Sequence, residues 1–380
     1  MFLRFFRAQV SQFRVFNTNA RKLILANFLI GLFNPFYLIF ANTFIFSSSK
    51  GNLNLNLLYC SFTFFGILAG FLLNGYLLRY IHVKKQLING VFIVFLAIVL
   101  MFELPVSFIK NSLWVLILGL VTGIGNGIYW SSRNYLTVVN TNDRNRDFFA
   151  GIDFILISIG RVLTPLLVGL YIGEGIRMGW FSRQDAYRST TLIALLLLVS
   201  SAVVIFPRKY KTVKPGKYLY ARYENLWMNA RKMFFLLGIF QGASTVLPPV
   251  LIMKYLGNES QVGIITSICY LVAITTIYSI SKRSTVHHRS LILKITALVL
   301  CCSAIFFSIM VHYQYYLATI ILIITLLLAE PMFGFPTRAT FMKTIDELKH
   351  LENRDTYSYV VDIEIFTESG RMLSLVIFYV

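Results

Sequence analysis

Charged side chains are scarce in this sequence, acidic ones most of all. Asp, Glu, Lys and Arg make up 13% of the 380 residues, with 16 acidic residues against 35 basic ones. Soluble domains carry about a quarter charged residues. Hydrophobic residues reach 57%, in recurring runs of about 20 residues that can cross the ~30 Å hydrocarbon layer as helices. The composition excludes an ordinary soluble domain and predicts an all-α polytopic membrane protein.

Cysteine is also rare, and its placement argues against two kinds of site. The four cysteines lie within apolar runs and lack the Cys and His spacing of metal ligands: Cys60, Cys269, Cys301 and Cys302. We therefore expect no disulfide framework and no metal, and no motif predicts another cofactor. The chain also lacks a G-x-x-x-x-G-K-S/T sequence, which argues against an ATP-driven pump.

The net charge of +19 would suggest a nucleic-acid partner if the protein were soluble. Here the basic residues lie beside apolar runs, where the positive-inside rule accounts for them. Most of the 35 Lys and Arg residues fall on one side if the N-terminus is cytoplasmic. We therefore expect the lipid bilayer and no nucleic acid as partner, in the plasma (inner) membrane. The N-terminus lacks the apolar core of a signal peptide, so we expect an interfacial segment there.

Eleven segments are predicted to span the membrane, and they form two copies of one unit. Gly160–Leu163 and Gly370–Leu373 match at an offset of 210 residues, as do Asn19–Lys22 and Asn229–Lys232. This offset predicts two parallel six-helix repeats. The expected parts are an N-terminal bundle at 1–206, a basic cytoplasmic linker at 207–231 and a C-terminal bundle at 232–380. The second bundle would hold five spans, with a twelfth span expected to be missing from this chain. The expected spans are 23–46, 54–78, 87–106, 112–139, 148–172, 189–206, 233–256, 261–281, 291–311, 315–340 and 358–380.

Two parallel six-span repeats with a basic central linker resemble the major facilitator superfamily. The loop after the second span keeps a glycine and basic residues, Gly75, Lys84 and Lys85, but has Arg79 near the position where that family carries Asp. The resemblance implies an alternating-access permease for a small polar solute, working as a monomer, with these four residues as a gating loop. It identifies no solute.

Charges within the apolar spans are the strongest candidates for a transport site. Each costs roughly 2.5–3.5 kcal/mol to insert and needs a partner or a wet cavity. Arg161 and Arg371 lie deep in equivalent spans, where we expect them to face each other's halves near the membrane midplane. Acidic candidates are Asp153, set against Arg161, together with Glu330, Glu364 and Glu368. We expect the arginines to hold an anionic or zwitterionic solute and Glu330 to exchange a coupling proton. The competing interpretation is that Glu368 and Arg371 only neutralise each other.

Uncharged polar and aromatic residues add weaker candidates. Asn34 and Gln241 lie near prolines in matching regions of the two copies, and we expect them to line a cavity; helix–helix hydrogen bonding is the alternative. Tyr129 and Trp130 either stack on a ligand or belong to an interfacial aromatic belt.

Two other classes of function stay open at this stage. His350 and Asp355 form an H-x4-D spacing that some membrane-bound acyltransferases use to activate a hydroxyl. A non-transporting sensor or scaffold would also suit the altered loop after the second span. We expect a carrier and no enzyme.

Overall fold

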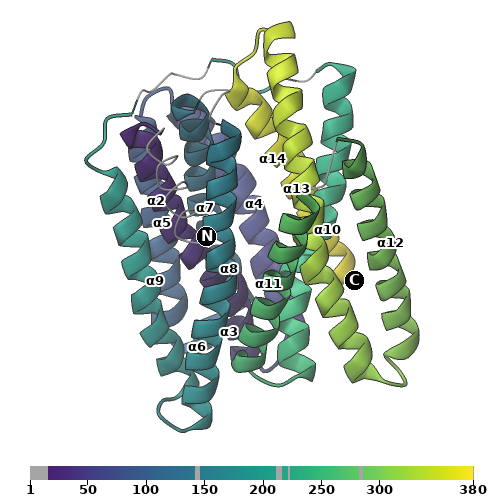
Figure 1. Cartoon of the computed structure of the whole chain (residues 1–380). Coiled ribbons are helices and arrows are strands. Elements are labelled where there is room, and N and C mark those ends of the chain that lie inside the picture. Colours follow the sequence, from purple (N-terminus) through teal and green to yellow (C-terminus); the bar gives the residue numbers. More distant parts are fainter. Residues whose placement is uncertain (1–15, 142–145, 211–215, 221–222, 282–285, 380) are drawn as a thin grey trace, which may run out of the picture.

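The computed structural model describes residues 16–141, 146–210, 216–220, 223–281 and 286–379 (Figure 1). Its regular elements are helices throughout this described part. They are α2 (Thr18–Pro35), η1 (Phe36–Phe40), α3 (Ala41–Ser48), α4 (Leu53–Leu77), α5 (Val83–Glu103), α6 (Val106–Ile109), α7 (Ser112–Asn140), α8 (Arg146–Arg177), α9 (Arg183–Ile205), α10 (Asn225–Tyr255), α11 (Glu259–Ser281), α12 (Val286–Met310), α13 (Tyr315–Leu351) and α14 (Thr356–Tyr379). The predicted all-α fold is confirmed.

Ten helical stretches of the described chain are long and apolar enough to cross a membrane. α14 is not one of these ten, although it occupies the expected eleventh span. The charges of Asp362, Glu364, Glu368 and Arg371 lower its apolarity. α14 nevertheless packs against α10 and α4 inside the bundle.

The first span is not a uniform helix. Asn17 caps α2 by accepting a hydrogen bond from the Ala20 amide at 2.7 Å. Pro35 ends α2, and the next five residues form a π-helical turn, η1, before α3 begins. Proline cannot donate the usual helical hydrogen bond. Nearby, Thr164 of α8 donates to the Leu32 carbonyl at 2.7 Å. A neighbouring helix therefore satisfies one backbone group beside the irregularity.

The helices before the linker form one group, in which α7 packs very closely against α4 and against α5, and α2 contacts α8 and α9. A Cβ at Gly123 would lie 2.1 Å from the Thr63 carbonyl oxygen, and one at Gly127 would lie 2.3 Å from that of Ile67. Backbone contact at these two positions requires glycine, and it fixes the spacing of α4 and α7.

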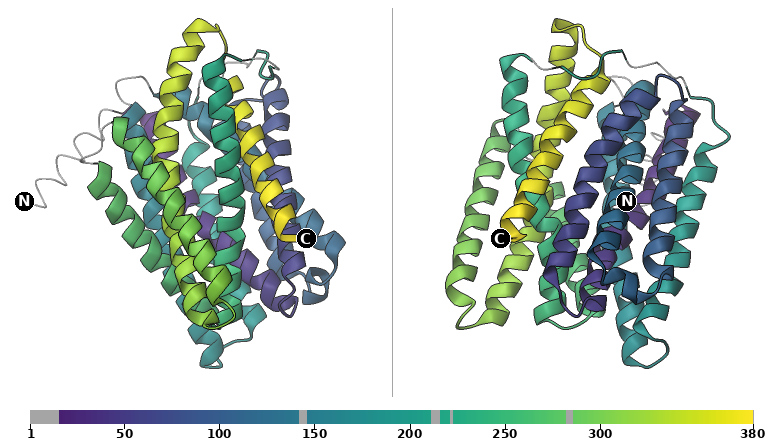
Figure 2. Two further views of the ribbon diagram at one scale, coloured as in Figure 1. Left: turned by 90° about the vertical axis from the view of Figure 1, so that its right-hand side faces the viewer. Right: turned by 180° about the vertical axis from the view of Figure 1, so that it is seen from behind.

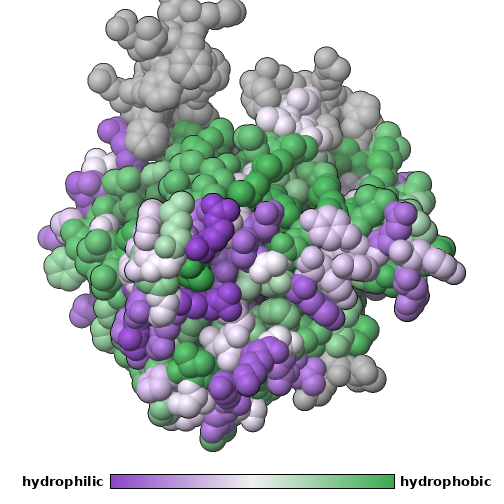
Figure 3. Space-filling model, turned by 90° about the horizontal axis from the view of Figure 1, so that it is seen from below, coloured by the Kyte–Doolittle hydropathy of each residue, from purple (hydrophilic) through white to green (hydrophobic). Residues whose placement is uncertain are grey.

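The helices after the linker form a second group, in which α10 packs on α14 and α13, and α11 and α12 pack on α13. The groups meet mainly where α8 contacts α11 and where α4 contacts α14. Figure 2 (right) shows α14 in yellow beside the dark blue α4. We call the end that carries the linker the linker end, and the other the opposite end. The opposite end presents hydrophilic side chains with apolar ones around them (Figure 3).

Candidate functional site

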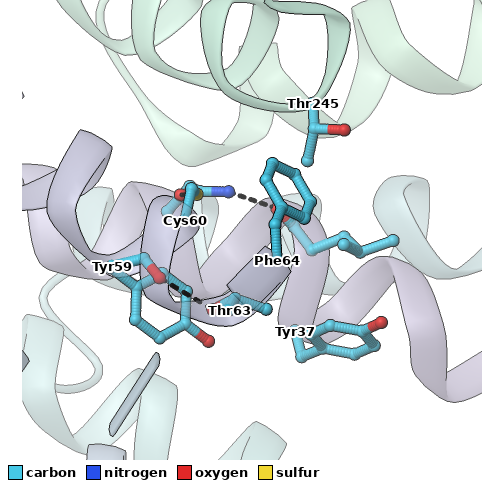
Figure 4. A pocket seen from close by; sticks show the side chains of 8 residues that line it. Tyr37, Tyr59, Cys60, Thr63, Phe64 and Thr245 are labelled. Atoms are coloured by element: carbon cyan, nitrogen blue, oxygen red, sulfur yellow. Dashed lines mark hydrogen bonds between the residues drawn. The ribbon is translucent and has the colours of Figure 1, made fainter. Parts of the chain in front are cut away.

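A small cavity lies between the two groups of helices. From the first group it is lined by Tyr37, Leu38, Asn42, Tyr59, Cys60, Thr63 and Phe64, and from α10 of the second by Thr245. Figure 4 shows Thr245 reaching toward Phe64, with Tyr37 below them. Asn42 is held in place because its amide donates to the Leu38 carbonyl at 2.6 Å and its oxygen accepts from the Cys60 thiol at 3.1 Å.

Arg371 lies next to this cavity and joins three helices. Its guanidinium carbon is 5.4 Å from the centre of the Phe64 ring, which lines the cavity. Its Nε donates to Oε1 of Gln241 on α10 at 3.1 Å, and its Nη1 pairs with Glu368 one turn earlier on α14. The sequence-predicted residues Arg371, Glu368 and Gln241 therefore do come together, beside a residue of the other group.

Glu368 differs from the other acidic candidates in how its oxygens are paired. The side chain is 0% exposed, and Oε1 accepts from Arg371. Oε2 is buried and has no hydrogen-bond partner among the described residues. Glu364, one turn earlier on α14, is only half-buried. A buried carboxylate oxygen without a partner is costly, so this atom is prepared to receive a proton or a donor from a ligand.

Arg161 and Glu330 form a second charged cluster, which bridges the two groups of helices. Nη1 of Arg161 on α8 lies 3.0 and 3.1 Å from the two carboxylate oxygens of Glu330 on α13. The Tyr270 hydroxyl of α11 donates to Glu330 Oε2 at 3.0 Å, and its ring lies 5.4 Å from the Arg161 guanidinium. Both oxygens of Glu330 are thus satisfied. The partner of Arg161 is Glu330, and not Asp153 as expected.

Asp153 instead pairs with Arg133, and this pair was missed. Arg133 falls near the end of the expected span 112–139, and the structure places it within α7 with a largely buried side chain. Asn27 donates to Asp153 Oδ1 at 2.9 Å and accepts from the Tyr129 hydroxyl at 3.0 Å. The Trp130 ring lies 5.6 Å from the Arg133 guanidinium. Tyr129 and Trp130 therefore complete a buried polar cluster inside the first group.

The remaining predicted residues are dispersed. Asn34 Oδ1 is buried without a hydrogen-bond partner in the described part of the chain. Lys84 donates to the Phe206 carbonyl at 2.9 Å within the first group, and Lys85 is exposed. Gly75 and Arg79 contact the linker instead: a Cβ on Gly75 would lie 2.7 Å from the Tyr218 ring, and Arg79 donates to the Gly216 carbonyl at 3.2 Å.

Two further ion pairs were not found from the sequence. Near the linker end, Arg231 binds both oxygens of Asp362 at 2.7 Å, and the Trp227 indole donates to the same carboxylate at 2.6 Å. Arg231 belongs to one of the matching Asn-Ala-Arg-Lys segments, so the repeat carried a signal for it. At the opposite end, Arg183 of α9 lies 3.2 Å from the buried Glu259 of α11.

The acyltransferase motif gains no support from the described residues. The side chain of His350 lies outside them. Asp355 Oδ1 accepts from the Tyr357 amide at 3.0 Å, which is the geometry of a cap at the start of α14.

Comparison with known proteins establishes the family. The model of the Major Facilitator Superfamily matches residues 23–356. The chain belongs to this superfamily, and it is a multi-pass membrane protein with a transporter fold. This confirms the resemblance inferred from the repeats and the linker.

Two curated relatives match parts of the chain. The protein YqgE of Bacillus subtilis (strain 168), described as uncharacterized, is 24% identical over 277 residues, or 70% of this chain and 60% of the relative. A Geobacillus stearothermophilus protein encoded in the sodM 3' region is 37% identical over 61 residues, or 16% of this chain and 28% of the relative. The chain thus spans less than two thirds of either relative.

Several solved transporters share the fold at low sequence identity. A D-xylose–proton symporter is similar with a TM-score of 0.68 at 12% identity, covering 95% of this chain and 88% of that one. The nucleoside transporter NupG gives 0.65 at 12%, covering 96% and 91%. An inward-facing bacterial homologue of the iron transporter ferroportin gives 0.60 at 13%, covering 95% and 97%. Sugar, nucleoside and metal transporters thus share this fold, which by itself selects no solute.

Proposed function

We propose that this protein is a secondary-active carrier that moves a small polar solute by alternating access, coupled to protons. The observation that carries the proposal is the Arg371, Glu368 and Gln241 cluster beside a cavity lined by both groups of helices. In a membrane such charges are retained where they serve a pathway for a solute or ion. We further propose that the helix groups at 1–206 and 232–380 move as two bodies joined by the linker.

Arg371 is the proposed anchor for the solute. Its guanidinium can bind a carboxylate or phosphate through two donors at once. Gln241 occupies its Nε and Nη2, and Glu368 occupies its Nη1. A solute anion would displace the neutral Gln241 amide more readily than the charged Glu368. Because Gln241 can give way to an anion, the arrangement around Arg371 favours an anionic or zwitterionic solute.

Glu368 is the proposed proton carrier, in place of Glu330. Both oxygens of Glu330 are satisfied by Arg161 and Tyr270, whereas Glu368 has a buried oxygen without a partner. When the bound solute shares the Arg371 guanidinium, the positive charge of Arg371 stabilises the Glu368 carboxylate less. Protonation of Glu368 then becomes favourable. Arg161 and Glu330 then serve as a latch between the groups. We place the carrier in the plasma membrane as a monomer with its linker in the cytoplasm.

Purified protein in liposomes that contain a pH-sensitive dye tests this proposal. Pools of amino acids, organic anions and sugars are added outside, and proton movement into the liposomes is recorded. We expect one pool to elicit proton flux in the wild type. Arg371→Gln should abolish it, while Glu368→Gln should keep solute exchange and lose proton movement. Lys50→Gln, at an exposed turn of the opposite end, is the matched control. Absence of both solute and proton flux with every pool would overturn the proposal.

A further inference from the structure

Each half presents an arginine in a turn at the linker end. The turn between α4 and α5 carries Arg79, and the first turn of α5 carries Lys84 and Lys85, with no acidic residue between positions 78 and 85. On the other half, Arg354 lies in the turn before α14. Arg79 and Arg354 cannot pair with each other, because both are cations, and Arg354 lies 3.6 Å from Glu352 of its own turn. A contact that joins these two arginines needs another kind of residue between them.

The linker supplies tyrosines that bind both arginines. The Arg79 guanidinium lies 5.7 Å from the centre of the Tyr218 ring. The Arg354 guanidinium lies 4.2 Å from the Tyr220 ring and 4.5 Å from the Tyr223 ring. These distances are within the ~6 Å range of cation–π attraction. Two residues apart, Tyr218 and Tyr220 thus engage basic residues of opposite halves.

Tyr218 also fills a space that only glycine leaves open. The nearest atoms to a Cβ built on Gly75 are three carbons of the Tyr218 ring, at 2.7 to 3.0 Å. The Tyr218 hydroxyl donates to the Leu72 carbonyl of α4 at 3.2 Å. The ring is therefore seated on the last turns of α4, where any larger residue at position 75 would move it.

The same ring reaches the second half. Tyr218 meets Tyr357, in the first turn of α14, at 6.1 Å between ring centres and 72° between ring planes. The Tyr357 hydroxyl is placed 3.4 Å from the Phe71 carbonyl of α4, and its ring contacts Tyr135 of α7 at 5.8 Å. Edge-to-face pairs of this kind are favourable. Tyr218 thus lies against α4 and also against Tyr357, the α14 residue that itself contacts α4.

We propose that Tyr218 and Tyr220 form an aromatic clasp that holds the two halves together at the linker end. Tyr218 is a wedge between α4 and α14, and Tyr220 fastens the linker to Arg354. Both are positioning residues that set how often the linker end opens. The proposal rests on the alternating-access function proposed above, because a clasp matters only if this end opens during the cycle.

The test measures the opening of the linker end directly, without a solute. Cysteines replace the exposed Lys85 and Leu351, on opposite halves, in a chain whose four native cysteines are changed to serine. Spin labels on them report the distance distribution by double electron–electron resonance in lipid nanodiscs. We expect a closed population in the otherwise wild-type chain. Tyr218→Ala should raise the ratio of open to closed molecules about tenfold, because the closed state loses an aromatic contact of that strength.

Three variants keep the test decisive. Tyr218→Phe retains the ring and should stay closed. Gly75→Ala displaces the Tyr218 ring without altering it and should open the linker end to the same extent as Tyr218→Ala. It carries the test alone if Tyr218→Ala fails to fold. Tyr210→Ala is the matched control, because its hydroxyl reaches the Asn19 carbonyl of the first half at 3.5 Å. The clasp would be overturned if the spin-label distance distributions of Tyr218→Ala and Gly75→Ala both equalled that of Tyr210→Ala. Since no solute is used, the clasp and the transport proposal can fail independently.

Discussion

At the scale of single residues, charge pairs decide how this chain tolerates ions among apolar helices. Arg133 and Asp153, Arg231 and Asp362, and Arg161 and Glu330 each place a cation against a carboxylate from another helix. Removing one partner of a buried pair leaves an uncompensated charge, which costs more than the pair itself is worth. Single neutralising substitutions should therefore be more harmful than double ones.

We predict that Asp153→Asn destabilises the protein by about 3 kcal/mol, because it leaves the Arg133 guanidinium buried without a counter-charge. Thermal unfolding of the purified protein in nanodiscs measures the effect. Adding Arg133→Met to the same chain should recover part of the loss, since the uncompensated charge is then gone. An unfolding temperature for Asp153→Asn equal to that of the wild type would contradict the pairing.

Sequence reasoning identified the right kind of residue more easily than the right partner. The cost of inserting a charge singled out Arg161, Arg371 and Glu330, because that cost depends only on the residue and its depth. Which helices meet depends on tertiary packing, and for this reason Asp153 was set against Arg161. Arg133 was missed because it is near the end of a span, where a lysine or arginine usually faces the aqueous side.

At the scale of elements, helix positions followed well from apolar runs, while helix ends and irregularities did not. Asn225–Arg231 was expected to be linker, yet α10 already begins at Asn225. Its amphipathic first turns bury Trp227 and Arg231, which polar composition alone does not indicate. The π-helical turn at Phe36–Phe40 was also not anticipated, although Pro35 suggested a break.

The contact between α4 and α7 depends on glycine, and this gives a second prediction. Gly123→Ala would place a methyl 2.1 Å from the Thr63 carbonyl oxygen, a group that cannot move without moving α4. We expect a loss of about 1–3 kcal/mol from overpacking, read as a lower unfolding temperature.

The control for this substitution is in the same half. A Cβ at Gly151 of α8 would meet no heavy atom within 4 Å. Gly151→Ala should therefore leave stability unchanged or raise it, since alanine favours helix. Equal effects at positions 123 and 151 would mean that close packing is not what Gly123 provides.

At the scale of the whole molecule, the repeat and the distribution of basic residues predict the orientation in the membrane. The test compares maleimide labelling of two single-cysteine variants in intact cells, in the cysteine-free background. They are Lys217→Cys in the linker and Met178→Cys at the opposite end, where Met178 is 54% exposed. A membrane-impermeant maleimide should label Met178→Cys directly and Lys217→Cys only after permeabilisation. The reverse pattern would place the linker outside.

A fourth prediction concerns pH. Burial, reinforced by the charge of Asp362, raises the pKa of Tyr223 to about 12. Because this pKa exceeds the unfolded value of about 10, the neutral phenol contributes stability that is complete below pH 10 and lost as pH rises through 12. Tyr223 contacts Arg354 beside the clasp, so this contact should stay intact and the linker end should close equally well between pH 6 and 9. A change in the spin-label distances over that range would point to a carboxylate or histidine latch instead.

The wide turn in the first span has a consequence for how the proposed alternating-access cycle would reset. Phe36–Phe40 includes Tyr37 and lies between α2, which packs on the first half, and α3, which contacts α10. A π-turn holds one surplus residue, and moving that surplus along the helix rotates the residues it passes by about 100°. Such a screw motion would swing Tyr37 and Leu38 away from the cavity and bring other side chains in. Loading and release would then differ by the winding of one helix.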